Sequence, residues 1–192
     1  GAITRNNPMG QTCGLICPDK FCVRACVRHK VDFAINIPKV QATILAFHRE
    51  RDEAPAPAET GRKVAVIGAG PAGIAAADLL ARGGVHVEIF EARGEIGGAL
   101  NMIPQERLPH GVIERDWEHI AHHERIVLHL DSRVDDPCAL CGLYDGVIVA
   151  TGEPNCIALG IPGEALSVSY MDYLYHPERY ATDGAVAVIG GG

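Results

Sequence analysis

Several features are scarce in this sequence of 192 residues, and each scarcity excludes a class of protein. No apolar run reaches the roughly 18 residues that a transmembrane helix needs, which excludes a membrane span. The N-terminus has no basic region followed by an apolar stretch, so no signal peptide is predicted. Lys and Arg number 17 against 24 Asp and Glu, and the net charge of -7 argues against a nucleic-acid surface.

An evenly paired set of cysteines is missing as well. The chain has seven cysteines: Cys13, Cys17, Cys22 and Cys26 lie close together, and the other three lie far from them. A secreted disulfide framework would be short, rich in cysteine and evenly paired. We therefore expect a cytoplasmic, reducing environment in which the cysteines serve as thiolate ligands or buried thiols.

Three sections follow one another along the chain. Residues 1–50 contain the clustered cysteines and then apolar residues at helical spacing. Residues 51–62, rich in Ala, Pro and charge, predict an extended linker. From residue 63 onward, short β-branched runs alternate with helices, which is typical of a parallel α/β sheet. Strands are expected at 63–68, 85–91, 125–130, 145–152 and 185–192, and helices at 71–82, 111–123 and 170–175.

The last expected strand repeats the first, because VAVIGAG near its start is matched by VAVIGGG at the end of the chain. A buried parallel strand needs a crossover helix to cover it, and none follows the second copy. We therefore expect a first nucleotide-binding domain over 63–184 and the start of a truncated second one over 185–192.

A glycine motif gives the clearest chemical signal. Gly68, Gly70 and Gly73 form G-x-G-x-x-G directly after a strand and at the start of a helix. The first glycine permits the tight turn, the second lets the backbone approach a pyrophosphate, and the third lets the helix pack on the strand. The helix N-terminus then offers N–H groups and a positive dipole end to the phosphates.

An acidic residue lies where such a site needs one. Glu91 ends the second strand about 20 residues after the glycines, where a carboxylate accepts both ribose hydroxyls and disfavours a 2′-phosphate. The site therefore favours FAD or NAD over NADP. FAD is preferred because two later motifs resemble those of flavoproteins with two dinucleotide domains. These motifs are the glycine pair Gly97–Gly98 and the strand end formed by Ala150, Thr151 and Gly152.

The spacing of the four clustered cysteines leaves three interpretations open. Cysteines four residues apart could line one helix face as buried hydrophobic residues, although Pro18 breaks a single helix through all four. A structural zinc site usually has two close Cys pairs, which this spacing allows only loosely. Iron–sulfur ligation needs thiolates on an irregular loop, and a Cys-Pro pair in such a run is typical of ferredoxins.

Taken together, these motifs resemble one family over nearly the whole chain. The motifs are NPMGQTCGLICPDKFCVRACVRHKVDFAINIPKVQ, GAGPAG, IPQERLP, VIVATG and GIPGE. The family comprises the N-terminal half of dihydropyrimidine dehydrogenase, the glutamate synthase small chain and related FAD/NAD(P)H iron–sulfur oxidoreductases. It implies a partial helical 4Fe–4S domain over 1–50, followed by a Rossmann-like FAD-binding domain.

The resemblance also implies individual roles. Cys17, Cys22 and Gln41 would ligate one 4Fe–4S cluster and Cys26 the other, whereas Cys13 would have no ligand role. These residues make up half of the ligand set of two clusters, so we expect the printed chain to begin inside its domain, to lack complete clusters and to be inactive alone. FAD binding by the printed chain should be weak or absent too, because the family closes its flavin site with a segment that returns after the nucleotide domain. Residues 1–50 would then be loosely ordered, or would fold back to bury Ile35, Ile37, Leu45 and Phe47. Further FAD contacts would come from Pro71, Ala72, Ala92, Leu100, Arg107 and Val134.

The expected function is electron transfer from NAD(P)H through FAD to the clusters and on to a partner domain or subunit. The cofactors carry this chemistry, so no residue of the chain is expected to be catalytic. Two alternatives remain. One is a non-catalytic nucleotide-binding module that carries electrons, and the other is a flavoenzyme with a redox-active dithiol, like thioredoxin reductase.

Two further groups are interpreted without a functional role. Cys138 and Cys141 form a C-x-x-C pair that could be redox-active, but it lies outside the motifs of the family, and an incidental pair is favoured. His119, His122 and His123 could hold a metal, but a solvated amphipathic helix is favoured.

Overall fold

The structure is a computed structural model that describes residues 3–4, 7–47, 57–109, 111–120, 123–152, 157–180 and 183–190. The chain divides into two compact units, Gly1–Gly152 and Glu153–Gly192. Among the described residues, no helix has both the length and the apolar character needed to cross a membrane.

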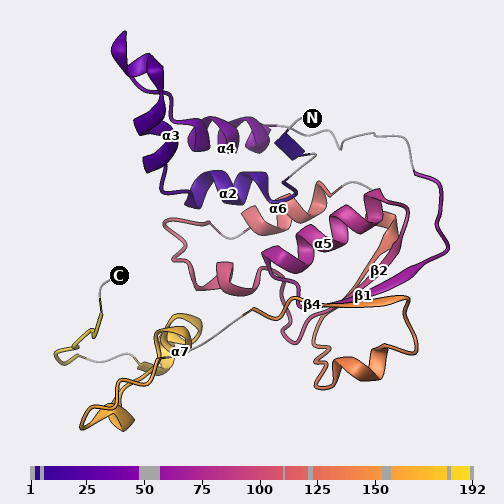
Figure 1. Ribbon diagram of the computed structural model, residues 1–192. Helices are drawn as coiled ribbons and strands as arrows, with labels where there is room; N and C mark the ends of the chain where they lie inside the picture. Colours follow the sequence, from indigo (N-terminus) through magenta and orange to yellow (C-terminus); the bar gives the residue numbers. More distant parts are fainter. Residues whose placement is uncertain are drawn as a thin grey trace. The chain divides into compact units, whose positions relative to one another are not determined.

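A four-stranded parallel sheet organises the first unit (Figure 1). Its strands are β1 (Lys63–Ile67), β2 (His86–Phe90), β3 (Ile126–His129) and β4 (Gly146–Val149), in the spatial order β3-β2-β1-β4. All neighbouring strands run parallel, so their carboxyl ends meet at one edge. The predicted α/β class and four of the five predicted strands are thereby confirmed.

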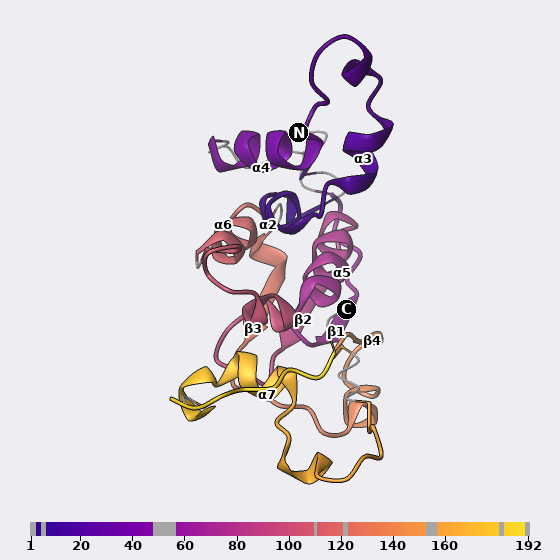
Figure 2. The same ribbon diagram turned by 90° about the vertical axis from the view of Figure 1, so that its left-hand side faces the viewer.

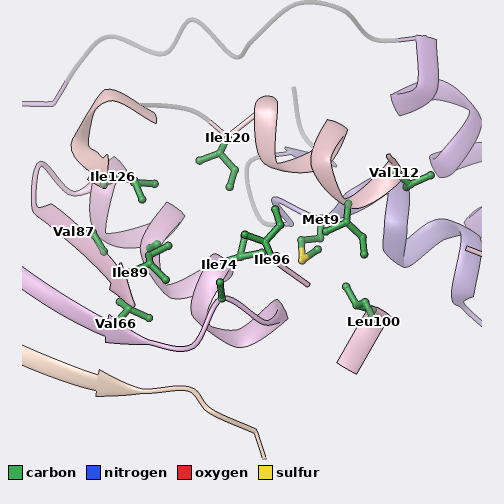
Figure 3. Packing of buried hydrophobic residues seen from close by; sticks show 14 of the residues in the cluster. Met9, Val66, Ile74, Val87, Ile89, Ile96, Leu100, Val112, Ile120 and Ile126 are labelled. Atoms are coloured by element: carbon green, nitrogen blue, oxygen red, sulfur yellow. The ribbon is translucent and has the colours of Figure 1, made fainter. Parts of the chain in front are cut away.

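Helix α5 (Pro71–Arg82) covers one face of this sheet, the face that carries Val66 and Ile89. It begins directly after the glycine turn and confirms the predicted helix over 71–82. Its Ile74 packs in a buried cluster with Val66 and Ile89, which come from the sheet face toward the helix. Figure 3 shows this cluster together with Met9, from the N-terminal part of the chain, which lies among Ile96 and Leu100.

Polar residues gather on the opposite face of the sheet. The Glu88 carboxylate is bonded to Lys63 Nζ at 2.5 Å, His129 Nε2 at 2.9 Å and the Tyr144 hydroxyl at 2.8 Å. The Lys63 ammonium, with further help from Tyr144 and His129, lowers the pKa of Glu88 to about 2. Desolvation and Glu88 raise the pKa of Tyr144 to about 12. This group connects β1, β2, β3 and the loop before β4.

Three short helices precede the sheet: α2 (Gly10–Ile16), α3 (Lys20–Ala25) and α4 (Ile37–Phe47), with a 3-10 turn, η1, at Val27–Lys30. α2 lies between α4 and α6 (Val112–Glu118), as Figures 1 and 2 show. Gly10 and Gly14 let α4 approach closely, because a Cβ on Gly14 would lie 2.6 Å from the Pro38 carbonyl oxygen. The helical interpretation of 37–45 is confirmed.

The burial expected for the N-terminal segment is wrong in its details. Ile35, Ile37 and Phe47 are exposed, and Leu45 is only half-buried. The segment contacts the α/β part through Met9 and α2 instead. The reason is that α4 turns Pro38, Ala42 and Leu45 toward the glycine face of α2. Ile37 and Phe47 are left exposed.

Two predicted elements differ from the structure. The helix expected over 111–123 ends at Glu118, where the N–H groups of His119 and Ile120 bond to carbonyls three residues back and close the last turn; residues 121 and 122 lie outside the described part. No strand forms over 185–190, and the described residues of the second unit contain no other strand with which this segment could pair. Residues 191–192 are outside the described range.

The second unit is built from short helical turns. η5 (Glu164–Leu166), α7 (Tyr170–Tyr175) and η6 (Pro177–Tyr180) follow one another. The Ser169 hydroxyl caps α7 by accepting the Asp172 N–H at 3.1 Å, and the predicted helix over 170–175 is confirmed. Three further 3-10 turns lie in the first unit: η2 (Gly98–Met102), η3 (His123–Arg125) and η4 (Pro137–Leu140).

Candidate functional site

The glycine turn after β1 lies where three strands end. The Gly68 N–H donates to the Phe90 carbonyl at 2.8 Å, and a Cβ on Gly68 would lie 2.5 Å from the Ala150 carbonyl oxygen. Gly68 also has a φ of +105°, a conformation that side chains rarely adopt. The ends of β1, β2 and β4 are therefore joined at this residue.

The other two glycines of the motif serve different needs. A Cβ on Gly73 would lie only 1.9 Å from the Gly68 carbonyl oxygen, so the fold itself requires glycine there. A Cβ on Gly70 would meet only Gly98 Cα, at 3.9 Å, which is an ordinary contact. Gly70 is the N-cap of α5 and has an extended backbone, with φ -78° and ψ -178°. The fold does not require glycine at this position.

The later glycine pair, Gly97–Gly98, lies against the same loop. The Gly97 N–H donates to the Ala69 carbonyl at 2.9 Å. A Cβ on Gly98 would lie 3.1 Å from Gly70 Cα, and both Gly97 and Gly98 have positive φ. Two backbone segments without side chains therefore face each other beside the first turn of α5. Because an α-helix leaves its first N–H groups without partners inside the helix, those of Ala72 and Gly73 are available to an anion here.

Glu91, the acidic residue at the end of β2, is hydrogen-bonded to the glycine loop. Its side chain is 8% exposed; Oε2 accepts the Ala69 N–H at 2.7 Å and Oε1 the Arg93 N–H at 2.9 Å. Each carboxylate oxygen can accept a second hydrogen bond, so a diol can still be bound. Holding the loop is a role that the sequence did not indicate. The ribose role remains a prediction.

Only some of the remaining residues predicted to contact FAD lie near the glycine loop. Thr151 lies beside Gly68, since its nitrogen would be 3.2 Å from a Cβ there, and Gly152 follows it. Ala92 is exposed, Leu100 is buried in the core, and Val134 is half-buried in the loop after β3. Leu100 contacts the later glycine pair through its N–H, which donates to the Gly97 carbonyl at 3.1 Å.

Arg107 makes a contact that the motif does not predict. Its Nη2 donates to the Ile16 carbonyl at 3.0 Å, at the end of α2 and next to Cys17. The side chain is exposed, and its backbone N–H closes a turn on Pro104. A flavin contact of Arg107 remains a prediction.

The clustered cysteines lie at the ends of short helices. α2 ends at Ile16, before Cys17 and Pro18, which confirms that no single helix runs through all four. Cys13, Cys17 and Cys22 are exposed, and Cys26 accepts the Ile35 N–H at 3.4 Å on its sulfur. That bond and others to the backbone lower the pKa of the Cys26 thiol.

The predicted cluster ligands include a glutamine, Gln41, in addition to the cysteines. Within the described part of the chain, no three or more Cys, His, Asp or Glu side chains form a group that could hold a metal ion. The predicted ligand Gln41 donates its side-chain amide to the Gly10 carbonyl at 2.8 Å. Ligation of a cluster by Cys17, Cys22, Cys26 and Gln41 remains a prediction. His122 and the side chain of His123 lie outside the described part.

One residue that the sequence did not indicate holds α2 in place. Asp116 of α6 accepts the Thr12 N–H at 2.8 Å on one carboxylate oxygen and the Gln11 N–H at 3.2 Å on the other. Burial raises the pKa of Asp116, against the opposing effect of these N–H donors. The sequence did contain a signal for this role, because Asp116 is an acidic residue on the apolar face of an amphipathic helix. Its partners, Gln11 and Thr12, could not be identified because they lie over 100 positions away in the sequence.

The parallel sheet, α5 and the glycine turn give the first unit a Rossmann-like fold of the α/β class. A protein-family model described as an NAD(P)-binding Rossmann-like domain matches residues 66–123. The chain is 34% identical to the glutamate synthase (NADPH) small chain of Halomonas elongata, over 98% of this chain and 44% of that protein. It is 38% identical to the NAD-dependent dihydropyrimidine dehydrogenase subunit PreT of Salmonella typhimurium, over 99% of this chain and 49% of that one.

The glutamate synthase small chain of Escherichia coli strain K12 is 34% identical over 83% of this chain and 35% of its own length. The chain is a homologue of these oxidoreductases, in agreement with the resemblance found in its motifs. It spans less than half the length of the three relatives.

Proposed function

We propose that the chain forms the FAD-binding part of a cytoplasmic oxidoreductase in which electrons pass from NAD(P)H through FAD to 4Fe–4S clusters and a partner domain or subunit. The observation that carries the proposal is the close approach of Gly70 and Gly98 beside the first turn of α5. The fold alone does not need glycine at Gly70, whereas a pyrophosphate lying against the backbone does.

The chain's own residues would bind and orient the dinucleotide. The N–H groups of Ala72 and Gly73 would donate to the phosphates, and the Glu91 carboxylate would accept the ribose hydroxyls while it holds the Ala69 N–H. FAD, when bound, would supply the hydride and single-electron chemistry.

Several features favour FAD over a nicotinamide nucleotide at this site. The glycine pair Gly97–Gly98 lies against the first glycine loop, and the VIVATG strand end lies at Gly68, as expected for a flavin domain with a second dinucleotide domain after it. The names of the relatives include both NADPH and NAD, so the choice of nicotinamide cofactor stays open. Cys17, Cys22, Cys26 and Gln41 are proposed as cluster ligands by resemblance alone, and no step is derived through them.

The test is a set of titrations of FAD, NADH and NADPH against the chain and its Gly70→Val variant. We expect FAD to bind the parent chain most tightly, and the valine side chain to weaken that binding at least about tenfold by occupying the pyrophosphate position. Tighter binding of either nicotinamide nucleotide at the glycine loop would overturn the assignment of FAD. Equal binding of FAD by the two proteins would overturn the site.

A further inference from the structure

We propose that Cys138 and Cys141 form a redox-active dithiol that exchanges with small-molecule disulfides such as glutathione disulfide. The pair lies on η4, in the loop that leads from β3 to β4 (Figure 1, orange). Both thiols are free and exposed to solvent. Neither the glycine loop nor Glu91 takes part in this proposal, so it stands apart from the proposed function.

Because η4 is a 3-10 turn, the side chains of Cys138 and Cys141 lie on the same side of it. The Cys141 N–H donates to the Cys138 carbonyl at 3.1 Å, which is the three-residue hydrogen bond of a 3-10 turn. Cys141 itself keeps helical angles, with φ -61° and ψ -22°. Because a 3-10 helix has three residues per turn, side chains at positions 138 and 141 lie one above the other on the same side.

The separation along the turn also suits a disulfide. Three residues at a rise of about 2.0 Å place the two Cα atoms about 6 Å apart, inside the range of about 4.4–6.8 Å found in disulfides. The turn is fixed at its start by Asp136, which accepts the Cys138 N–H at 2.9 Å. It is fixed at its end by Tyr144, whose N–H bonds to the Leu140 carbonyl. Closing the disulfide therefore needs side-chain rotation and little movement of the backbone.

The exchange balances without any group from outside the pair and its substrate. The thiolate of one cysteine attacks glutathione disulfide, the sulfur–sulfur bond of glutathione breaks, and one glutathione thiolate leaves and takes up a proton. The thiolate of the second cysteine then attacks the mixed disulfide and releases the second glutathione. The protein loses two electrons and two protons, and the glutathione disulfide gains both.

The test is equilibration of the chain in buffers with an increasing fraction of glutathione disulfide, followed by alkylation and digestion with an enzyme that cleaves before aspartate. Cleavage before Asp136 and Asp145 releases residues 136–144, DPCALCGLY, which contain this pair and no other cysteine. We expect the peptide from the parent chain to lose two hydrogens and to carry no glutathione. Excess dithiol reductant should restore two alkylation sites.

Single variants provide the first control. Cys138→Ser and Cys141→Ser each leave one thiol, which should retain a glutathione adduct because no second thiol can displace it. We expect that adduct to exceed the one on the parent chain at least about tenfold, given the high effective concentration of a neighbouring thiol. Equal adducts on the parent chain and the single variants would overturn the proposal.

A double variant tests the geometry. Cys141→Leu combined with Leu140→Cys keeps two cysteines in the turn but moves the second one to a different side of the 3-10 helix. We expect this variant to retain the glutathione adduct. Closure as complete as in the parent chain would show that proximity alone, and not the stacking of positions 138 and 141, explains the reaction.

Discussion

The glycines of the nucleotide loop differ in whether the fold requires glycine at their positions. Gly73 cannot carry a side chain, because a Cβ would lie 1.9 Å from the Gly68 carbonyl oxygen. Gly70 has an extended backbone and open space, so the fold would accept alanine there. The fold tolerates a side chain at position 70, whereas a bound pyrophosphate would not. A substitution there can therefore separate an effect on stability from an effect on binding.

We expect Gly70→Ala to change the free energy of unfolding by less than about 1 kcal/mol. The restriction of the unfolded chain by alanine stabilises the fold, and the preference of the N-cap for glycine over alanine opposes this gain. The same variant should bind FAD more weakly, since the methyl group points into the phosphate position. Denaturant unfolding and flavin titration measure the two effects. Gly73→Ala is the control and should lower stability by about 1–3 kcal/mol through overpacking. FAD binding unaltered by Gly70→Ala would place the phosphates elsewhere.

Glu91→Ala should weaken FAD binding by about 1–3 kcal/mol, because charge-assisted hydrogen bonds to the ribose are lost. It should also lower stability, because the N–H groups of Ala69 and Arg93 lose their acceptor. Glu91→Gln keeps one acceptor oxygen and should lie between the two proteins. Flavin titration beside thermal unfolding provides the measurement, with the exposed Glu95→Ala as control. An unchanged flavin affinity in Glu91→Ala would remove the ribose role.

Among the elements, α2 depends on a side chain of another helix. It has only seven residues, and short isolated helices are unstable in water, so its contacts with α4 and α6 hold it in place. Asp116 accepts two N–H groups of its first turn, and Arg107 donates to its last carbonyl. Both ends of α2 are thereby bonded to the α/β part of the first unit.

Asp116→Ala should release the first turn of α2. Hydrogen exchange of the Gln11 and Thr12 amides should become faster, while that of the β1 and β2 amides should stay slow. The reason is that both amides lose their acceptor and meet solvent. Glu114→Ala, on the exposed side of α6, is the matched control. Unchanged exchange at Gln11 and Thr12 would show that packing against α4 is sufficient.

The sheet should carry an acid-sensitive contribution to stability from Glu88. Its pKa is lowered from 4.5 to about 2, first by Lys63 and then by Tyr144 and His129. A lowered pKa means that the folded state binds the proton more weakly. The stability that it gives is therefore full above pH 4.5 and is lost as the pH falls toward about 2.

Glu88→Gln should reduce the slope of unfolding free energy against pH in this window, because glutamine does not titrate. Thermal unfolding of the variant and the parent chain, compared between pH 2 and pH 5, isolates the contribution of Glu88. Identical slopes for the two proteins would show that the ion pair with Lys63 has no effect on stability.

For the whole molecule, local patterns predicted much of the fold, and distant contacts could not be predicted. The strand runs and the glycine turn indicated the parallel sheet and α5, because each depends on residues close in sequence. The docking of α2 on Asp116 and the insertion of Met9 into the core depend on pairs over 50 residues apart, which no periodicity reveals. The strand expected at 185–190 did not form because an apolar run specifies no partner.

Iron content tests the cluster prediction for the printed chain. We expect fewer than the roughly four irons per chain that one complete 4Fe–4S cluster would give. The reason is that, by resemblance, Cys17, Cys22 and Gln41 offer three ligand positions for one cluster and Cys26 offers one for another. Iron and sulfide analysis of anaerobically purified protein, with its visible absorption, measures this. A full complement of four would mean that Cys13 joins the other three cysteines in one site.

The position of Met9 gives the first unit an unusual response to cleavage of its chain. Met9 belongs to the buried cluster with Ile74 and Leu100, although more than 50 residues separate it from β1. A single protease cut between α4 and β1 would leave two peptides that share one core. The pieces should migrate together until denatured, and their melting temperature should then rise with protein concentration, because separation would have become a dissociation.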